Sequence, residues 1–377
     1  MDLGLSEEQE MLRKSARDFL RRECSKQLVR QLDESDEGYS SELWRRMAEL
    51  GWMGLVFPEK YGGSGHSFLD LAILLEEMGY NIVPGPFFST VVLGGLTILA
   101  AGNEQQKMEF LPKIARGELI LCFALTEPTA SYDAASVKTT AIARDGEYVI
   151  RGTKLFVLNA NVADYILCVA RTKETKDLED GITVFLIDGR SPGVTCRLLK
   201  TLARDKQCEV IFENVTVSEK NILGRKDKGW PIVKDILQKA AVAKCAEMVG
   251  GAQAALDMAV SYARERVQFG RPIGSFQAIQ HYCANMVMDV SGSRFMTYKA
   301  AWKVSEGLPS ALDAAIAKTW VGEAYGRVVL SAHQIFGAIG FTMDHDIHLY
   351  YRQAKAAEIV FGGADFHRAV VAHELGL

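Results

Sequence analysis

The segment Arg264-Glu-Arg-Val-Gln-Phe-Gly-Arg-Pro-Ile-Gly-Ser-Phe-Gln-Ala-Ile-Gln-His281 joins two long helical patterns, and the rest of the chain is organised around it. From Pro231 to Arg266 apolar residues recur at spacings of three and four, which predicts an amphipathic helix. The glycines and proline of residues 270–274 stop this pattern, which resumes at Phe276. We therefore expect a sharp corner between two helices.

Polar side chains gather at this corner. Arg266, Gln268 and Gln277 are close enough in sequence to lie around a single turn of the chain. A guanidinium beside amide groups can bind a pyrophosphate or the edge of a nucleotide. A polar turn between two bundle helices is the plainer explanation for an arbitrary cluster of this kind. The wider context of the chain has to decide between the two interpretations.

Length and composition indicate a globular protein with more than one part. The chain has 377 residues, of which 48% are apolar and 24% charged, and its formal net charge is −4. This length exceeds that of one ordinary hydrophobic core. No stripe of basic residues runs along it, so neither nucleic acid nor an anionic membrane is expected as a partner.

Cysteine usage and the amino terminus point to the cytoplasm. The seven cysteines are widely scattered and no pair has the CxxC spacing, which predicts reduced thiols. The first ten residues lack a basic region followed by an apolar run, and no later window approaches the length of a membrane span. We expect neither secretion nor membrane insertion.

Apolar periodicity divides the chain into three parts. Helical spacing dominates residues 1–120, where Ser6 caps the first amphipathic helix. Residues 121–228 change to alternation, with a hairpin signal at Asp145-Gly146. Residues 229–377 return to the helical pattern. The order predicts an α+β fold with helical, β and helical domains. Strands are expected at 148–150, 166–170, 182–187 and 210–212.

Several ordered motifs resemble those of the acyl-CoA dehydrogenase family of FAD flavoproteins. The corner resembles the segment with which these enzymes hold FAD across a subunit interface. Pro58-Glu-Lys-Tyr-Gly-Gly-Ser-Gly65, Phe123-Ala-Leu-Thr-Glu-Pro128 and Gln334-Ile-Phe-Gly-Ala-Ile-Gly-Phe341 resemble further family motifs. The resemblance covers nearly the whole chain. It implies an N-terminal helical domain, a middle β-barrel or sandwich domain and a C-terminal four-helix bundle, assembled as a tetramer.

The resemblance implies two groups of FAD contacts. On the adenine side they are Arg266, Gln268, Phe269, Gln277, Gln334, Gly337 and Ala338, and on the ring side Thr126, Phe156 and Leu158. Ala338 replaces a family glycine. Leu158 replaces the threonine whose hydroxyl pairs with the flavin ring in relatives, and an unpaired buried acceptor costs about 1–3 kcal/mol. The adenine side is thus the better preserved of the two.

The resemblance also implies the substrate side of the site, but without its usual base. Tyr132, Phe361 and Gly362 fall at positions that face the acyl-CoA, and Phe361 stands where most relatives carry the proton-abstracting glutamate. Phenylalanine cannot take a proton. The second family position for this base is Ala240.

Two other carboxylates are weak candidates for the base. They are Glu247 and Asp365. A structural role is the alternative for each, namely helix packing for Glu247 and a turn or cap for Asp365. His345 and His348 have a metal-like spacing, yet no cysteine or further histidine lies near them in sequence, so no metal site is expected.

The implied reaction is the α,β-dehydrogenation of an acyl-CoA thioester, with electrons passed to an electron-transfer flavoprotein. Because the interface motif is retained while the base is absent, the sequence favours one subunit of a hetero-oligomer with a homologous acyl-CoA dehydrogenase chain. Two alternatives remain open. The chain is either a non-catalytic partner subunit, or a homotetrameric dehydrogenase with an atypical base at Glu247 or Asp365.

Overall fold

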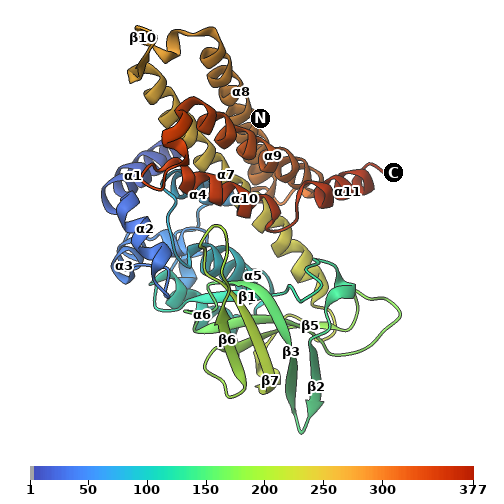
Figure 1. Cartoon of the computed structure of the whole chain (residues 1–377). Coiled ribbons are helices and arrows are strands. Elements are labelled where there is room, and N and C mark those ends of the chain that lie inside the picture. Colours follow the sequence, from blue (N-terminus) through green and yellow to red (C-terminus); the bar gives the residue numbers. More distant parts are fainter. Residues whose placement is uncertain (1–3) are drawn as a thin grey trace. The chain divides into compact units, whose positions relative to one another are not determined.

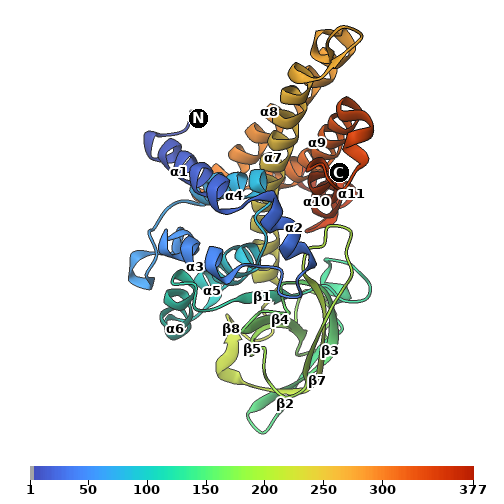
Figure 2. The same ribbon diagram turned by 60° about the vertical axis from the view of Figure 1, so that its left-hand side comes forward.

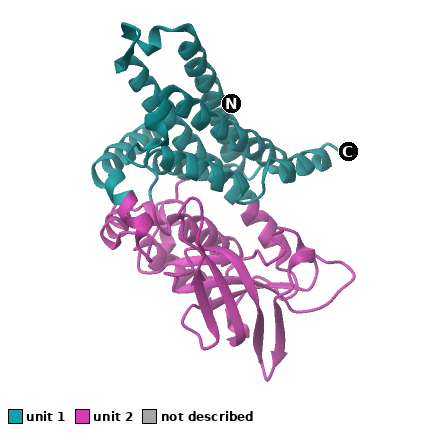
Figure 3. Ribbon diagram, viewed as in Figure 1, with its two compact units in different colours: residues 1–29, 67–83, 238–377 teal, residues 30–66, 84–237 magenta. Residues whose placement is uncertain are grey.

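The structure is a computed structural model that describes residues 4–377, and it divides into two compact units (Figure 3). Residues 1–3, part of the amino terminus in which no leader is expected, lie outside the described residues. Unit 1 comprises residues 1–29, 67–83 and 238–377, and unit 2 comprises residues 30–66 and 84–237. No helix among residues 4–377 is both long enough and apolar enough to cross a membrane.

Unit 1 is helical (Figure 1). α1 begins with the expected cap, since the Ser6 hydroxyl accepts from the backbone N–H of Gln9 while the Gln9 side chain accepts from the backbone of Ser6. α8 and α10 both pack on α9, and α11 packs on α9 further along. Its helices are α1 (Glu7–Glu23), α4 (Phe68–Asn81), the larger part of α7 (Trp230–Glu265), α8 (Gln277–Ser305), α9 (Ala311–Phe336), α10 (Ile347–Ile359) and α11 (Ala364–Glu374).

Two glycines let α4 and α7 touch backbone to backbone. A Cβ atom added at Gly250 on α7 would lie 1.8 Å from the Glu76 carbonyl oxygen on α4. One added at Gly79 on α4 would lie 2.0 Å from the Glu247 carbonyl oxygen on α7. Any side chain at either position would force the helices apart, because real Cβ contacts are never this short. The crossing therefore requires glycine at both positions.

Unit 2 contains one eight-stranded sheet, which curls around an apolar core (Figure 2). The strand order is β6-β7-β3-β2-β4-β5-β8, and β1 pairs with β4 in parallel. The strands are β1 (Leu121–Ala124), β2 (Thr140–Arg144), β3 (Glu147–Leu158), β4 (Tyr165–Arg171), β5 (Ile182–Asp188), β6 (Val194–Leu198), β7 (Gln207–Ser218) and β8 (Ile222–Leu223). Its helices include α3 (Ser41–Glu49), α5 (Leu96–Ala101), α6 (Glu104–Ala115) and the π-helix Phe88–Gly95, while α2 (Lys26–Glu34) crosses the boundary between the units.

The α+β class and the order of helical, β and helical domains are confirmed. The Asp145-Gly146 hairpin joins β2 to β3, and both residues have the positive φ that this tight turn requires. The four expected strands fall within β3, β4, β5 and β7. The alternation did not reveal β1, which is buried along its whole length and so carries no polar residue in alternate positions.

The connection between α10 and α11 is fixed by two buried side chains. The Lys318 ammonium on α9 donates to the carbonyl oxygens of Ala357, Glu358 and Gly362 at 3.1, 2.9 and 2.9 Å. A cation bonded to the last carbonyls of α10 also complements the dipole of that helix. His367 on α11 donates through Nε2 to the Phe361 carbonyl at 2.9 Å. Together they hold the loop that contains Phe361.

Replacing Gly250 with alanine should destabilise unit 1. The added methyl group would overlap the Glu76 carbonyl, and overpacking of this kind typically costs about 1–3 kcal/mol. A Cβ added at Gly326 on α9 would meet no neighbouring atom within 4 Å, so Gly326→Ala is the matched control and should gain up to about 1 kcal/mol. Urea unfolding of both variants checks this. Equal stabilities for the two would contradict the close crossing.

His367 should make the stability depend on pH between about 6.5 and about 4. Burial lowers the pKa of His367 from 6.5 to about 4, against the opposing hydrogen bond to Phe361. In that window the unfolded chain binds a proton that the folded chain does not, so the free energy of unfolding falls as the pH falls. A pKa difference of about 2.5, at about 1.4 kcal/mol per unit, corresponds to about 3 kcal/mol.

The test compares wild type with His367→Gln, which keeps a side-chain donor but cannot titrate. The variant should lose this part of the pH dependence in urea unfolding. His373→Gln, at an exposed histidine of the same helix, serves as the control and should behave as wild type. Parallel pH profiles for wild type and His367→Gln would refute the assignment.

Candidate active site

The corner that follows α7 is a short hairpin in unit 1. β9 (Val267–Gln268) pairs with β10 (Arg271–Pro272), and Phe269 and Gly270 form the turn with φ of 54° and 77°. Two successive positive φ values define a hairpin turn that suits glycine or asparagine, whereas a bulky residue there is strained. Phe269 is nevertheless 92% exposed, so packing of its ring within the chain does little to offset this backbone strain.

The polar residues of the corner are available to a ligand. Arg266, Gln268 and Gln277 are all exposed. Gln268 donates only to the carbonyl of its neighbour Val267, and no other described residue pairs with the Arg266 guanidinium or the Gln277 amide. The structure thus brings together the four corner residues that the sequence singled out.

A second predicted group lies at the carboxyl end of α9. Gln334, Gly337 and Ala338 are exposed, and Gly337 has a φ of 64° where the helix ends. Tyr262 on α7 packs against Phe336 with ring centroids 5.0 Å apart, which ties this helix end to the last turn before the corner. Both adenine-side groups therefore belong to one region of unit 1.

The ring-side residues lie in unit 2 and are organised by a buried ion pair. Lys154 on β3 is fully buried and contacts Glu127 at 2.7 Å, just after β1. Lys154 also donates to the Leu125 carbonyl, while Glu127 accepts from the backbone N–H groups of Lys138 and Thr139. Although burial opposes it, Lys154 helps to hold the pKa of Glu127 below its usual range. A fully bonded buried pair of this kind fixes the end of β1.

Thr126 and Phe156 are placed by this arrangement. The Thr126 carbonyl accepts from the backbone N–H of Leu155 at 2.8 Å. The pairing of β3 with β7 is irregular between Lys154 and Val157, and Phe156 has a φ of 57°. Bulges re-aim side chains next to functional sites. The Phe156 ring is 48% exposed as a result, although it lies within a strand.

The residue expected in place of the base is held rigidly. Phe361 is buried and has a φ of 60°, and Gly362 follows it with a φ of 97°. The hydrogen bonds from Lys318 and His367 fix both carbonyls of this pair. Ala240, the second family position for the base, is fully buried on α7.

The two candidate carboxylates have different surroundings. Glu247 lies on α7, largely buried, where it forms an ion pair with Lys244 and lines a cavity. The side chain of Asp365 is 100% exposed and pairs with Arg368 at 2.9 Å. Tyr132, the expected substrate contact of unit 2, is half-buried in the loop after β1.

Three functional features escaped the sequence analysis. These are the capping by Lys318, the anchoring by His367, and a cavity of unit 1 that Tyr325 and Glu247 line. The sequence signal for the capping was a lysine, Lys318, within the apolar pattern of α9. The other two depend on contacts between residues far apart in sequence.

The chemistry of the two groups fits FAD unequally. An unpaired guanidinium beside the exposed amides of Gln268 and Gln277 suits an anionic pyrophosphate or a nucleotide edge. On the ring side, the half-buried Leu158 side chain offers no hydrogen bond donor. The chain therefore fits the adenine half of FAD better than the reactive ring.

Comparison with known proteins gives matches along the whole chain. Family models match for the acyl-CoA dehydrogenase N-terminal domain at residues 6–118, the middle domain at 122–215 and the C-terminal domain at 227–376. The chain is 35% identical over 384 residues to a probable acyl-CoA dehydrogenase, YngJ, of Bacillus subtilis, and the match covers 100% of both.

Solved structures agree with these matches. Butyryl-CoA dehydrogenase from Megasphaera elsdenii superposes with a TM-score of 0.92 at 33% identity, covering 100% of both chains. One chain of the ChsE4–ChsE5 complex from Mycobacterium tuberculosis gives a TM-score of 0.91 at 28% identity, covering 100% of this chain and 99% of that one. Over its whole length the chain therefore belongs to the acyl-CoA dehydrogenase family of FAD-dependent oxidoreductases.

Proposed function

We propose that this chain works as one subunit of a hetero-oligomeric acyl-CoA dehydrogenase and contributes contacts to FAD across the subunit interface. The observation that carries this proposal is the contrast between two parts of unit 1. The corner residues Arg266 and Phe269 are displayed to solvent, whereas Phe361 buries an apolar ring at the position of the base.

The exposed corner supports an interface. Phe269 in the corner is 92% exposed, and Phe341 and Met343, at and just after the end of the motif that begins at Gln334, are 80% and 57% exposed. Exposed apolar patches of this kind mark surfaces that other molecules cover. A second subunit would bury these rings and complete a site for the anionic part of the cofactor.

The missing base supports a division of labour with a homologous chain. Neither Phe361 nor Ala240 can accept the α-proton of a thioester. A partner with an intact base and ring pocket would supply that step, and the ChsE4–ChsE5 complex is a relative built from two different proteins. When bound, FAD would supply the hydride acceptor. An electron-transfer flavoprotein is the acceptor that the family resemblance implies.

Among atypical bases within this chain, Glu247 is the better candidate. It lies in a cavity, whereas Asp365 is fully exposed at the surface. Its carboxylate forms an ion pair with Lys244 on the same helix. A homo-oligomeric dehydrogenase that uses Glu247 is accordingly the second candidate function.

Replacing Arg266 with alanine should weaken FAD binding. A lost charge-assisted hydrogen bond costs about 1.5–3 kcal/mol, which corresponds to at least tenfold in affinity. Flavin absorbance per mole of protein after dialysis measures the effect. Arg264→Ala, at an exposed arginine in the last turn of α7, is the control. Equal flavin retention in both variants and wild type would count against the corner as a cofactor site.

The chain alone should not bleach bound flavin with acyl-CoA esters under anaerobic conditions, because no residue takes the α-proton. Phe361→Glu should restore turnover, since general-base catalysis is worth about 10²–10⁴-fold. Phe361→Gln introduces a side chain of the same shape as glutamate but without a carboxylate, so this variant should stay inactive. Rapid bleaching by the unsubstituted chain would refute the partner model and leave Glu247 as the candidate base.

A further inference from the structure

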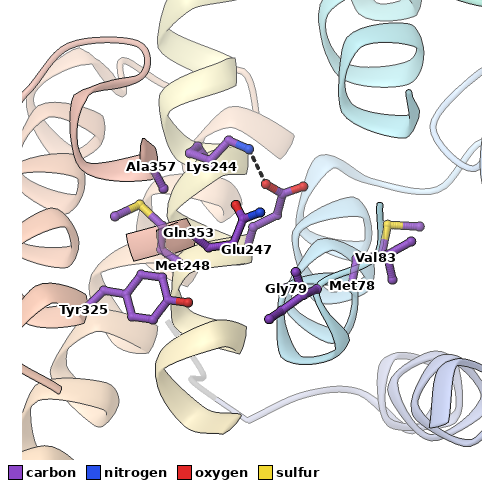
Figure 4. Close-up of a pocket in the computed structure, with 10 residues that line it drawn as sticks. Met78, Gly79, Val83, Lys244, Glu247, Met248, Tyr325, Gln353 and Ala357 are labelled. Carbon is purple, nitrogen blue, oxygen red and sulfur yellow. Dashed lines mark hydrogen bonds and ion pairs between the residues drawn. The ribbon is translucent and has the colours of Figure 1, made fainter. Parts of the chain in front are cut away.

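A cavity of about 70 Å³ lies within unit 1, between α4, α7, α9 and α10 (Figure 4). Its wall combines apolar side chains such as Met78 and Met248 with four polar ones, namely Lys244, Glu247, Tyr325 and Gln353. A volume of this size holds several water-sized groups but not a long hydrocarbon chain. The cavity therefore suits a small polar group at the end of an apolar segment.

The polar wall of the cavity has unused hydrogen-bonding capacity. Tyr325 is only 3% exposed, and its hydroxyl has no hydrogen bond to any other residue among 4–377. Figure 4 shows this hydroxyl pointing into the space beside Glu247 and Gly79. The Gln353 amide also makes no hydrogen bond within the described chain. The Tyr325 hydroxyl and the half-buried Gln353 amide both line the cavity, so both are available to a bound molecule.

The ion pair of Lys244 and Glu247 determines whether a charged or a neutral ligand group can bind in the cavity. Lys244 and Glu247 form an ion pair in which both side chains are largely buried. Burial, and then the neighbouring Glu247 carboxylate, raise the pKa of Tyr325, which keeps its hydroxyl protonated and able to donate. A charged ligand group would have to break the pair or face a like charge. A neutral group that both donates and accepts can bind without either penalty.

The cavity adjoins the part of α10 that precedes the loop that holds Phe361. Ala357 lines the cavity, and its carbonyl accepts from Lys318, which also binds the Gly362 carbonyl. Along α7, Lys244 and Glu247 lie about 6 and about 10 Å beyond Ala240, at a rise of about 1.5 Å per residue. A thioester whose α-carbon faced the base position would therefore extend its chain towards these side chains.

We propose that this cavity binds the far end of the acyl chain and selects thioesters whose chain ends in a neutral hydrogen-bonding group, such as a hydroxyl. This inference rests on the proposed function in that the chain is a subunit of an acyl-CoA dehydrogenase, and it adds that this subunit itself binds acyl-CoA beside Phe361. It adds a substrate class that the family assignment does not contain. Tyr325 and Gln353 are its specificity-determining residues.

The experiment measures the affinity of the flavin-loaded protein for three thioesters of equal length by titration calorimetry. They are ω-hydroxyhexanoyl-CoA, hexanoyl-CoA and adipoyl-CoA, which end in a hydroxyl, a methyl and a carboxylate. We expect the hydroxy ester to bind at least tenfold more tightly than the other two. Tyr325→Phe removes only the hydroxyl and should abolish that preference, with no loss of thermal stability.

Tyr80→Phe is the matched control, because the Tyr80 hydroxyl already bonds to Asp257 at 3.0 Å and does not line the cavity. This variant should keep the preference for the hydroxy ester. Equal affinities for all three esters, or tightest binding of hexanoyl-CoA or adipoyl-CoA, would overturn the inference while leaving the proposed function intact. Failure of all three to bind would also overturn the inference, whereas flavin retention by wild type and Arg266→Ala tests the proposed function separately.

Discussion

The backbone contact between α4 and α7 is the constraint on which the rest of unit 1 depends. Gly79 and Gly250 each face a carbonyl of the opposite helix, at distances that no side chain would permit. The contact fixes how far apart the two helices lie and therefore how Glu247 is presented. Its carbonyl faces Gly79 while its side chain lines the cavity. The two glycines thus determine both the distance between α4 and α7 and the position of a residue that lines the cavity.

Sequence periodicity predicted most of the architecture. The corner after α7, the capped start of α1 and the Asp145-Gly146 hairpin are local features with local signals, and each has the expected structure. The crossing of α4 and α7 had no such signal. It joins glycines 171 positions apart, counted from 79 to 250, and a glycine within a helical pattern indicates only a weak helix former.

The sequence predicted which residues belong to the candidate site, but it did not predict which of their side chains are buried and which are exposed. Motifs identified Arg266, Phe269 and Phe361, yet only the structure distinguishes the exposed corner from the buried ring. Glu247 and Asp365 were equal candidates in sequence. Their difference arises from what surrounds them, namely an ion pair in a cavity against open solvent. Burial depends on long-range contacts that no short motif encodes.

The capping by Lys318 has a chemical consequence beyond the fold. Burial lowers the pKa of its ammonium to about 8, and a lysine of this kind is ordinarily a good nucleophile towards electrophiles such as thioesters. Three backbone carbonyls occupy its three N–H donors, and the side chain is only 1% exposed. The ammonium form that donates these three bonds has no lone pair with which to attack a reactive acyl group. The bonds that order the Phe361 loop also protect the protein from acylating itself.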